Sequence, residues 1–100
     1  MPLFLINARD KANSTDLRLA NRQDHLTWAA KVADRMAMGG PVLSPDGETM
    51  IGTTFVMEFD DLAAVQAWAA DDPYAKAGLF DQVEIIPFKW LIGDGPSDGA

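Results

Sequence analysis

The spacing of apolar residues changes several times along the chain, and these changes predict six elements of secondary structure. Short apolar runs, some of them alternating with polar residues, predict strands, whereas apolar residues three and four positions apart predict helices. Glycine, proline and acidic residues mark the boundaries, because they end one element or cap the next. The expected elements are strands over 2–8, 41–44, 50–59 and 82–92, and helices from Ser14 or Thr15 to about Met38 and from Asp60 or Asp61 to about Asp71.

This order, β-α-β-β-α-β, is that of the ferredoxin-like fold, an α+β architecture with one antiparallel sheet and two helices on one of its faces. A length of 100 residues suits one domain. We expect this domain over residues 1–92 and a flexible tail over residues 93–100, where the sequence is small and polar. Pro87 within the last strand indicates an edge strand or a bulge, because proline cannot donate to a sheet ladder.

Both faces of the predicted sheet carry apolar residues. Phe55 and Met57 face one side of their strand and Val56 faces the other, and the strand over 82–92 also has apolar residues on both sides. Two helices cover only one face, and large apolar patches seldom stay exposed. We therefore expect a homodimer in which two sheets pack face to face. The alternative is a monomer with a partly exposed apolar sheet.

Composition and charge narrow the class of partner. The formal net charge is −7, which argues against nucleic acid or an anionic membrane surface, because both are bound by clustered Lys and Arg. No apolar run approaches the length needed to span a membrane. The chain has no cysteine, so a disulfide framework and a thiolate metal site are excluded, and a cytoplasmic location is expected. A small molecule or a protein partner remains.

The first predicted helix carries basic side chains on its apolar face. His25, the single histidine, shares one helical stripe with Arg22 and Arg18. The stripe is completed by Ala29, Val32 and Met36. A face that is apolar in one half and basic in the other indicates a lined cavity, because buried cations need partners or water. The structural alternatives are a half-buried histidine bonded to a backbone carbonyl and arginines that extend to solvent.

The stretch DDPYAKAGLF, residues 71–80, places two acids at the expected end of the second helix. A helix C-terminus disfavours an anion by roughly 0.3–1 kcal/mol, so a compensating partner is expected. Pro73 forces Asp72 into an extended conformation, which could direct its carboxylate toward His25 on the neighbouring helix. The alternative is a simple Asp-Pro helix stop with solvated acids.

The chain resembles the YCII-related (YciI-like) family of small dimeric α+β barrel proteins. The matching marks are the R-x-x-H-L of Arg22 to Leu26, the GGP of residues 39–41, the DG turn with Gly52 following, and DDPYAKAGLF with V-x-x-x-P-F from Val83. The resemblance implies a ferredoxin-like protomer that dimerises through its sheets, with an active site built from His25 and Asp72. It also implies a lyase or isomerase role on small ring compounds, although some relatives are stand-alone domains of no known activity.

The leading hypothesis is a cofactor-independent lyase or isomerase in which His25 is the general acid or base and Asp72 orients it. Histidine suits this work because its ordinary pKa lies near neutrality, and a neighbouring carboxylate favours its charged form. Arg22, and after it Arg18, could bind a substrate carboxylate or enolate, such as that of a cyclic acid. The remaining candidates for contact with the substrate are Tyr74 and Ser44.

The competing hypothesis is a non-catalytic module that binds a metabolite in the same pocket, for which a ligand would stabilise the protein without forming product. A third hypothesis is haem with His25 as axial ligand, and it requires Soret absorbance after haem addition. One histidine and one carboxylate make a poor ligand set for zinc or iron, so neither a metal nor another cofactor is expected.

Overall fold

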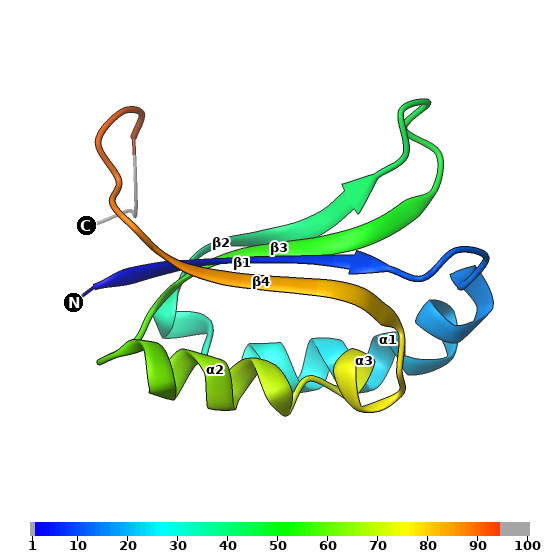
Figure 1. Ribbon diagram of the computed structural model, residues 1–100, viewed down its shortest axis with the longest axis horizontal. Helices are drawn as coiled ribbons and strands as arrows, with labels where there is room; N and C mark the ends of the chain where they lie inside the picture. The colour runs from blue at the N-terminus through cyan, green and yellow to red at the C-terminus, as the bar shows by residue number, and fades with distance from the viewer. Residues whose placement is uncertain (1, 95–100) are drawn as a thin grey trace.

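Residues 2–94 form a four-stranded antiparallel sheet with the helices on one of its faces, as shown by a computed structural model (Figure 1). The elements are β1 (Leu3–Asp10), α1 (Thr15–Ala30), the 3-10 turn η1 (Ala33–Arg35), β2 (Met36–Leu43), β3 (Met50–Glu58), α2 (Leu62–Ala70), α3 (Pro73–Lys76) and β4 (Phe80–Phe88). The strand order is β2-β3-β1-β4, so the predicted ferredoxin-like order is confirmed. Within residues 2–94, no helix is long and apolar enough to cross a membrane.

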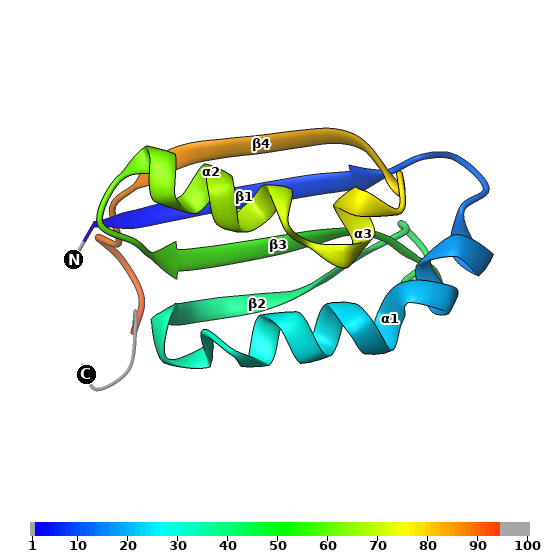
Figure 2. The ribbon, with the colours of Figure 1, turned by 90° about the horizontal axis from the view of Figure 1, so that it is seen from below.

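The core lies between the sheet and the helices. Phe4 and Ile6 of β1 pair with Met57 and Phe55 of β3, so their side chains share the helix-facing side, where Val65 of α2 packs against them. Each buried side chain of this kind stabilises the fold by roughly 1.5–3 kcal/mol relative to an exposed one. Seen from below, α1 runs along the β2 side of the sheet, α2 lies toward β1 and β4, and α3 lies between α2 and α1, near β3 (Figure 2).

The first helix is shorter than its apolar spacing predicted. It ends at Ala30 instead of about Met38, and β2 begins at Met36 instead of Pro41. The reason is the ladder with β3, in which Met36 pairs with Met57 and Gly39 with Phe55. Gly39, which follows the predicted helix end at Met38, lies inside β2, where a Cβ atom would lie 2.6 Å from Cδ1 of Phe55. The glycine thus makes room for the Phe55 ring.

A short third helix separates α2 from β4, and the sequence pattern did not predict it. The second helix ends at Ala70, and Asp72 begins α3 as its N-cap, since its Oδ1 accepts a hydrogen bond of 2.9 Å from the backbone N–H of Tyr74. Pro73 suits the first position of a helix, where no N–H donor is needed. The last strand spans Phe80–Phe88 instead of residues 82–92, and it lies at the sheet edge, as Pro87 predicted.

The face of the sheet opposite the helices carries a continuous apolar row. Met38, Val56, Leu5 and Ile86 are consecutive partners across all four strands. Met38 and Ile86 at the two ends are 43% and 41% exposed, whereas Val56 is buried. This row is called the outer row below. The expected tail over residues 93–100 lies mostly outside the described residues.

Candidate active site

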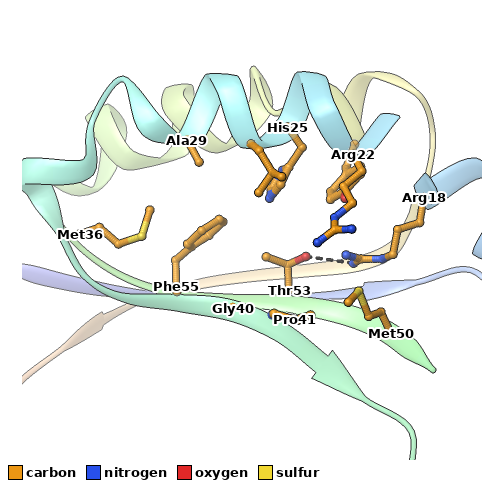
Figure 3. A pocket seen from close by; sticks show the side chains of 13 residues that line it. Arg18, Arg22, His25, Ala29, Met36, Gly40, Pro41, Met50, Thr53 and Phe55 are labelled. Carbon is orange, nitrogen blue, oxygen red and sulfur yellow. Dashed lines mark hydrogen bonds between the residues drawn. The ribbon is translucent and has the colours of Figure 1, made fainter. Parts of the chain in front are cut away.

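A cavity of about 190 Å³ lies between α1 and the strands β2 and β3 (Figure 3). Arg18, Arg22 and His25 project into it from α1, and Thr53 and Phe55 project from β3 on the opposite side. The remaining lining residues are Leu26, Ala29, Met36, Gly39, Gly40, Pro41, Met50 and Tyr74. Basic side chains of α1 therefore occupy one end and apolar side chains the other, but of the apolar residues predicted for the α1 stripe only Ala29 lies on α1, since Met36 lines the cavity from β2 and Val32 does not line it.

His25 and Asp72 are in direct contact. Nδ1 of His25 lies 2.8 Å from Oδ1 of Asp72, and the two side chains are 8% and 5% exposed. An ionised carboxylate can only accept hydrogen bonds, so this contact assigns the imidazole proton to Nδ1. The other ring nitrogen, Nε2, makes no hydrogen bond to any residue in 2–94. Asp72 itself lies behind His25 and does not line the cavity.

Tyr74 connects the histidine with the nearest arginine. Its ring stacks on His25 with centroids 4.1 Å apart and an interplanar angle of 16°, and the guanidinium carbon of Arg18 lies 4.7 Å from the ring centre. Burial raises the pKa of the Tyr74 phenol by more than the charge of Arg18 lowers it. The phenol is therefore protonated at neutral pH and can donate a hydrogen bond, but it cannot act as a base there.

Arg18 is held by two residues that the sequence pattern did not single out. Its Nε and Nη2 atoms donate to the two carboxylate oxygens of Asp10, at 2.7 and 2.9 Å, and Nη2 also donates to Oγ1 of Thr53 at 2.9 Å. Burial alone would lower the pKa of Arg18, but the hydrogen bonds and attraction of Asp10 outweigh it and raise the pKa. Arg18 is thus a fixed cation in a buried ion pair, with both side chains 5% exposed.

The other two candidates lie in contrasting places. Arg22 lines the cavity at its exposed side, and its side chain makes no hydrogen bond or ion pair within residues 2–94. Ser44 lies where the β2–β3 hairpin begins to turn, donates a hydrogen bond of 2.6 Å to Asp46, and is not among the residues that line the cavity. The structure therefore gathers His25 and both arginines around one cavity, and it places Ser44 elsewhere.

A signal for the two missed residues was present in the alternation of the strands. Asp10 continues the helix-facing series of Ala8 on β1, and Thr53 continues that of Phe55 on β3. Because β1 and β3 are antiparallel, both apolar series become polar at the same end of the sheet. That end faces Arg18, which is the basic part of the α1 stripe.

These observations define a class of protein: a ferredoxin-like α+β chain with a buried His–Asp pair beside a small basic cavity. The YCII-related domain matches residues 2–89, and the chain belongs to this family. Protein YciI of Escherichia coli O6:H1 is 38% identical over 94 residues, which cover 87% of this chain and 96% of that protein.

Solved structures extend the comparison. The 5-chloro-2-hydroxyhydroquinone dehydrochlorinase TftG of Burkholderia phenoliruptrix AC1100, in complex with 2,5-dihydroxybenzoquinone, is 30% identical with a TM-score of 0.79, over 91% of this chain and 95% of that one. An antibiotic biosynthesis monooxygenase is 11% identical with a TM-score of 0.56, over 92% of this chain and 100% of that one. The second likeness shows the fold alone, whereas the first is a likeness to a dehydrochlorinase at 30% identity.

Proposed function

We propose that this chain is a cofactor-independent lyase or isomerase of small ring compounds, in which His25 is the general acid and base and Asp72 orients it. The observation that carries the proposal is the 2.8 Å contact between Nδ1 of His25 and Oδ1 of Asp72 at the wall of the cavity. A carboxylate on Nδ1 holds one tautomer and stabilises the imidazolium that forms when Nε2 accepts a proton.

An elimination can be written with these groups alone. From the keto form of a hydroxylated ring, Nε2 of His25 removes the proton from the carbon beside a carbonyl. The C–H electron pair becomes a new double bond, and a halide on the next carbon leaves with its bonding pair. The proton on Nε2 then passes to water. The negative charge that develops on the carbonyl oxygen is stabilised by Arg18 and Arg22.

The similarity to the dehydrochlorinase TftG favours the lyase over the isomerase. An isomerase would use the same first step, but the proton on Nε2 would return to a different carbon of the ring. The size of the cavity, about 190 Å³, suits a single small ring. Its apolar wall, which includes Phe55 and Met36, suits the face of such a ring, and its basic end suits a carboxylate or an acidic hydroxyl.

The working form of the protein is proposed to be a homodimer. The outer row runs across all four strands, and its ends at Met38 and Ile86 are partly exposed in the single chain. A second copy of the same sheet would cover this surface, because a two-fold axis brings the same patch of the two subunits together.

The test is turnover of 5-chloro-2-hydroxyhydroquinone under anaerobic conditions, followed by chloride release, together with a panel of small cyclic acids. We expect His25→Gln and Asp72→Asn to lower the rate by roughly 10²- to 10⁴-fold. The matched control is Asp71→Asn, which changes the adjacent acid, whose side chain is 67% exposed and paired with Lys76. A wild-type rate in His25→Gln would refute the acid–base assignment. Stabilisation of the wild type by these compounds with no product would favour the binding module.

A further inference from the structure

The guanidinium of Arg18 is bonded along one edge only. Three of its five N–H donors are used by Asp10 and Thr53, as Nε donates once and Nη2 twice. The two N–H groups of Nη1 are used by neither of these residues, and the phenol of Tyr74, which lines the cavity together with Arg18, is the other side chain whose hydrogen bonding raises the pKa of Arg18. Figure 3 shows the guanidinium groups of Arg18 and Arg22 directed into the same end of the cavity, with the bond from Arg18 to Thr53 dashed.

The charges around the cavity are not equally balanced. Asp10 and Arg18 form a buried pair whose charges cancel, and Asp72 is directed at Nδ1 of His25. None of the residues that line the cavity is acidic. Arg22 lines the cavity, and within residues 2–94 no acidic side chain pairs with it. A ligand that fills the cavity can therefore supply the counter-charge of Arg22.

We propose that the site selects a planar ring bearing an ionised oxygen, and that the two arginines have different roles. Arg22 supplies the uncompensated positive charge that distinguishes an anionic ligand from a neutral one. Asp10 is a positioning residue: it holds Arg18 so that Nη1 faces the ligand. The carboxylate of Asp10 also cancels the charge of Arg18. The phenolate or enolate oxygen of a hydroxylated ring is the ligand group that fits both.

The inference rests on the proposed function only in taking this cavity as the substrate site, and it is tested by binding instead of turnover. The anionic probe is 2,5-dihydroxybenzoquinone, whose hydroxyls are vinylogous acids and ionise at neutral pH. The neutral probe of the same shape is 2,5-dimethylbenzoquinone. The chain contains no cysteine thiol that could add to either quinone. The Kd of each probe is measured by isothermal titration calorimetry.

We expect the wild type to prefer the anionic probe and Arg22→Gln to lose that preference by on the order of 10- to 100-fold, as for a hydrogen bond to a charged group. Binding of the neutral probe should change little, and Arg22→Lys should keep most of the preference. The matched control is Lys31→Gln, which removes an exposed positive charge just after α1, away from the cavity.

The role of Asp10 is tested in the Arg22→Gln background. Asp10→Asn can still accept a hydrogen bond from Arg18 but no longer cancels its charge. The double variant Asp10→Asn with Arg22→Gln should therefore recover part of the preference for the anionic probe. Asp10→Glu with Arg22→Gln keeps the negative charge, so it should stay as unselective as Arg22→Gln alone. A residue that merely stabilised the fold would produce no such recovery.

Three results would overturn the inference: a wild type without preference, an Arg22→Gln variant that weakens both probes equally, or an Asp10→Asn, Arg22→Gln double variant that recovers nothing. If that double variant does not fold, as judged by thermal denaturation, the Arg22 variants still decide the selectivity, and a recovered preference in Asp10→Glu with Arg22→Gln would overturn the role given to Asp10. Failure of the proposed function gives a different pattern, in which wild-type protein binds the anionic probe selectively but no ring compound is converted.

Discussion

His25 and Asp72, which are 47 residues apart in the chain, meet with Nδ1 and Oδ1 separated by 2.8 Å, and the same Oδ1 accepts the backbone N–H of Tyr74 at 2.9 Å. One carboxylate oxygen thus begins α3 and holds the imidazole. The consequence is that capping and orientation of the histidine are coupled, and substitutions of Asp72 can separate them.

Asparagine and alanine at position 72 should have different effects on stability. Asn caps a helix about as well as Asp, so Asp72→Asn should leave the free energy of unfolding nearly unchanged while activity falls. Asp72→Ala removes the cap and should lower the free energy of unfolding by about 0.5–2 kcal/mol. Denaturant unfolding measures both variants. Equal destabilisation by Asn and Ala would show that the cap contributes little and that the charge dominates.

The tautomer of His25 should be fixed. Because Nδ1 donates to Asp72, the neutral ring should carry its proton on Nδ1, and Nε2 should show the nitrogen chemical shift of an unprotonated position. A single histidine makes the two nitrogen signals unambiguous in an NMR spectrum. In Asp72→Ala the distinction between the nitrogens should shrink, whereas Asp71→Ala should preserve it. A wild-type ring protonated on Nε2 would contradict the geometry.

Gly39 and Gly40 are adjacent in β2 and both line the cavity, yet they should respond differently to alanine. A Cβ atom at Gly39 would lie 2.6 Å from Cδ1 of Phe55 and 2.8 Å from the sulfur of Met36, whereas one at Gly40 would meet nothing within 4 Å. Gly39→Ala should lower the free energy of unfolding by about 1–3 kcal/mol, because the Phe55 ring must move. Gly40→Ala should change it by less than about 0.5 kcal/mol. Thermal unfolding of the two variants checks the difference.

The order of the elements was predictable because apolar periodicity and turn residues are local signals. The end of α1 was not, since Val32 and Met36 keep helical spacing and only the pairing of Met36 with β3 shows that the chain is already a strand there. The helix α3 was missed for a similar reason. It is four residues long, and its N-cap Asp72 and Pro73 also fit a simple helix stop.

The candidate site was only partly predictable for the same physical reason. Helical phase placed Arg18 and His25 on one buried face, because both belong to one element. The partners of Arg18 come from β1 and β3, and identifying Asp10 and Thr53 required the register of those strands and the crossing of α1 over them. Alternation gave their side of the sheet, but it did not give the distance to the arginine.

The β2–β3 hairpin should respond to acid through Asp46. Hydrogen bonds from the Ser44 hydroxyl and from the backbone N–H of Glu48 lower the pKa of Asp46 below its ordinary value of 3.8. The stabilising effect of a lowered pKa is present above the unfolded value and is lost as the pH falls through the folded one. Ser44→Ala should raise the pKa of Asp46, as followed by carboxyl NMR. The difference in free energy of unfolding between Ser44→Ala and the wild type should shrink toward zero in acid, where Asp46 is protonated in both proteins.

The outer row leads to the last prediction, which concerns assembly. Ile86 is 41% exposed in the single chain and pairs with Leu5 of β1. If two sheets pack face to face, Ile86→Lys would bury two charges in an apolar interface and should convert the dimer into a monomer, because unpaired buried charge costs several kcal/mol. The fold of each chain should survive, since the position is half exposed without a partner.

The matched control is Leu19→Lys on α1, a residue that is 58% exposed on the opposite side of the molecule. Size-exclusion chromatography with light scattering gives the mass of each form. A wild type that is monomeric at micromolar concentration, or an Ile86→Lys variant that remains a dimer, would show that the outer row is not the interface.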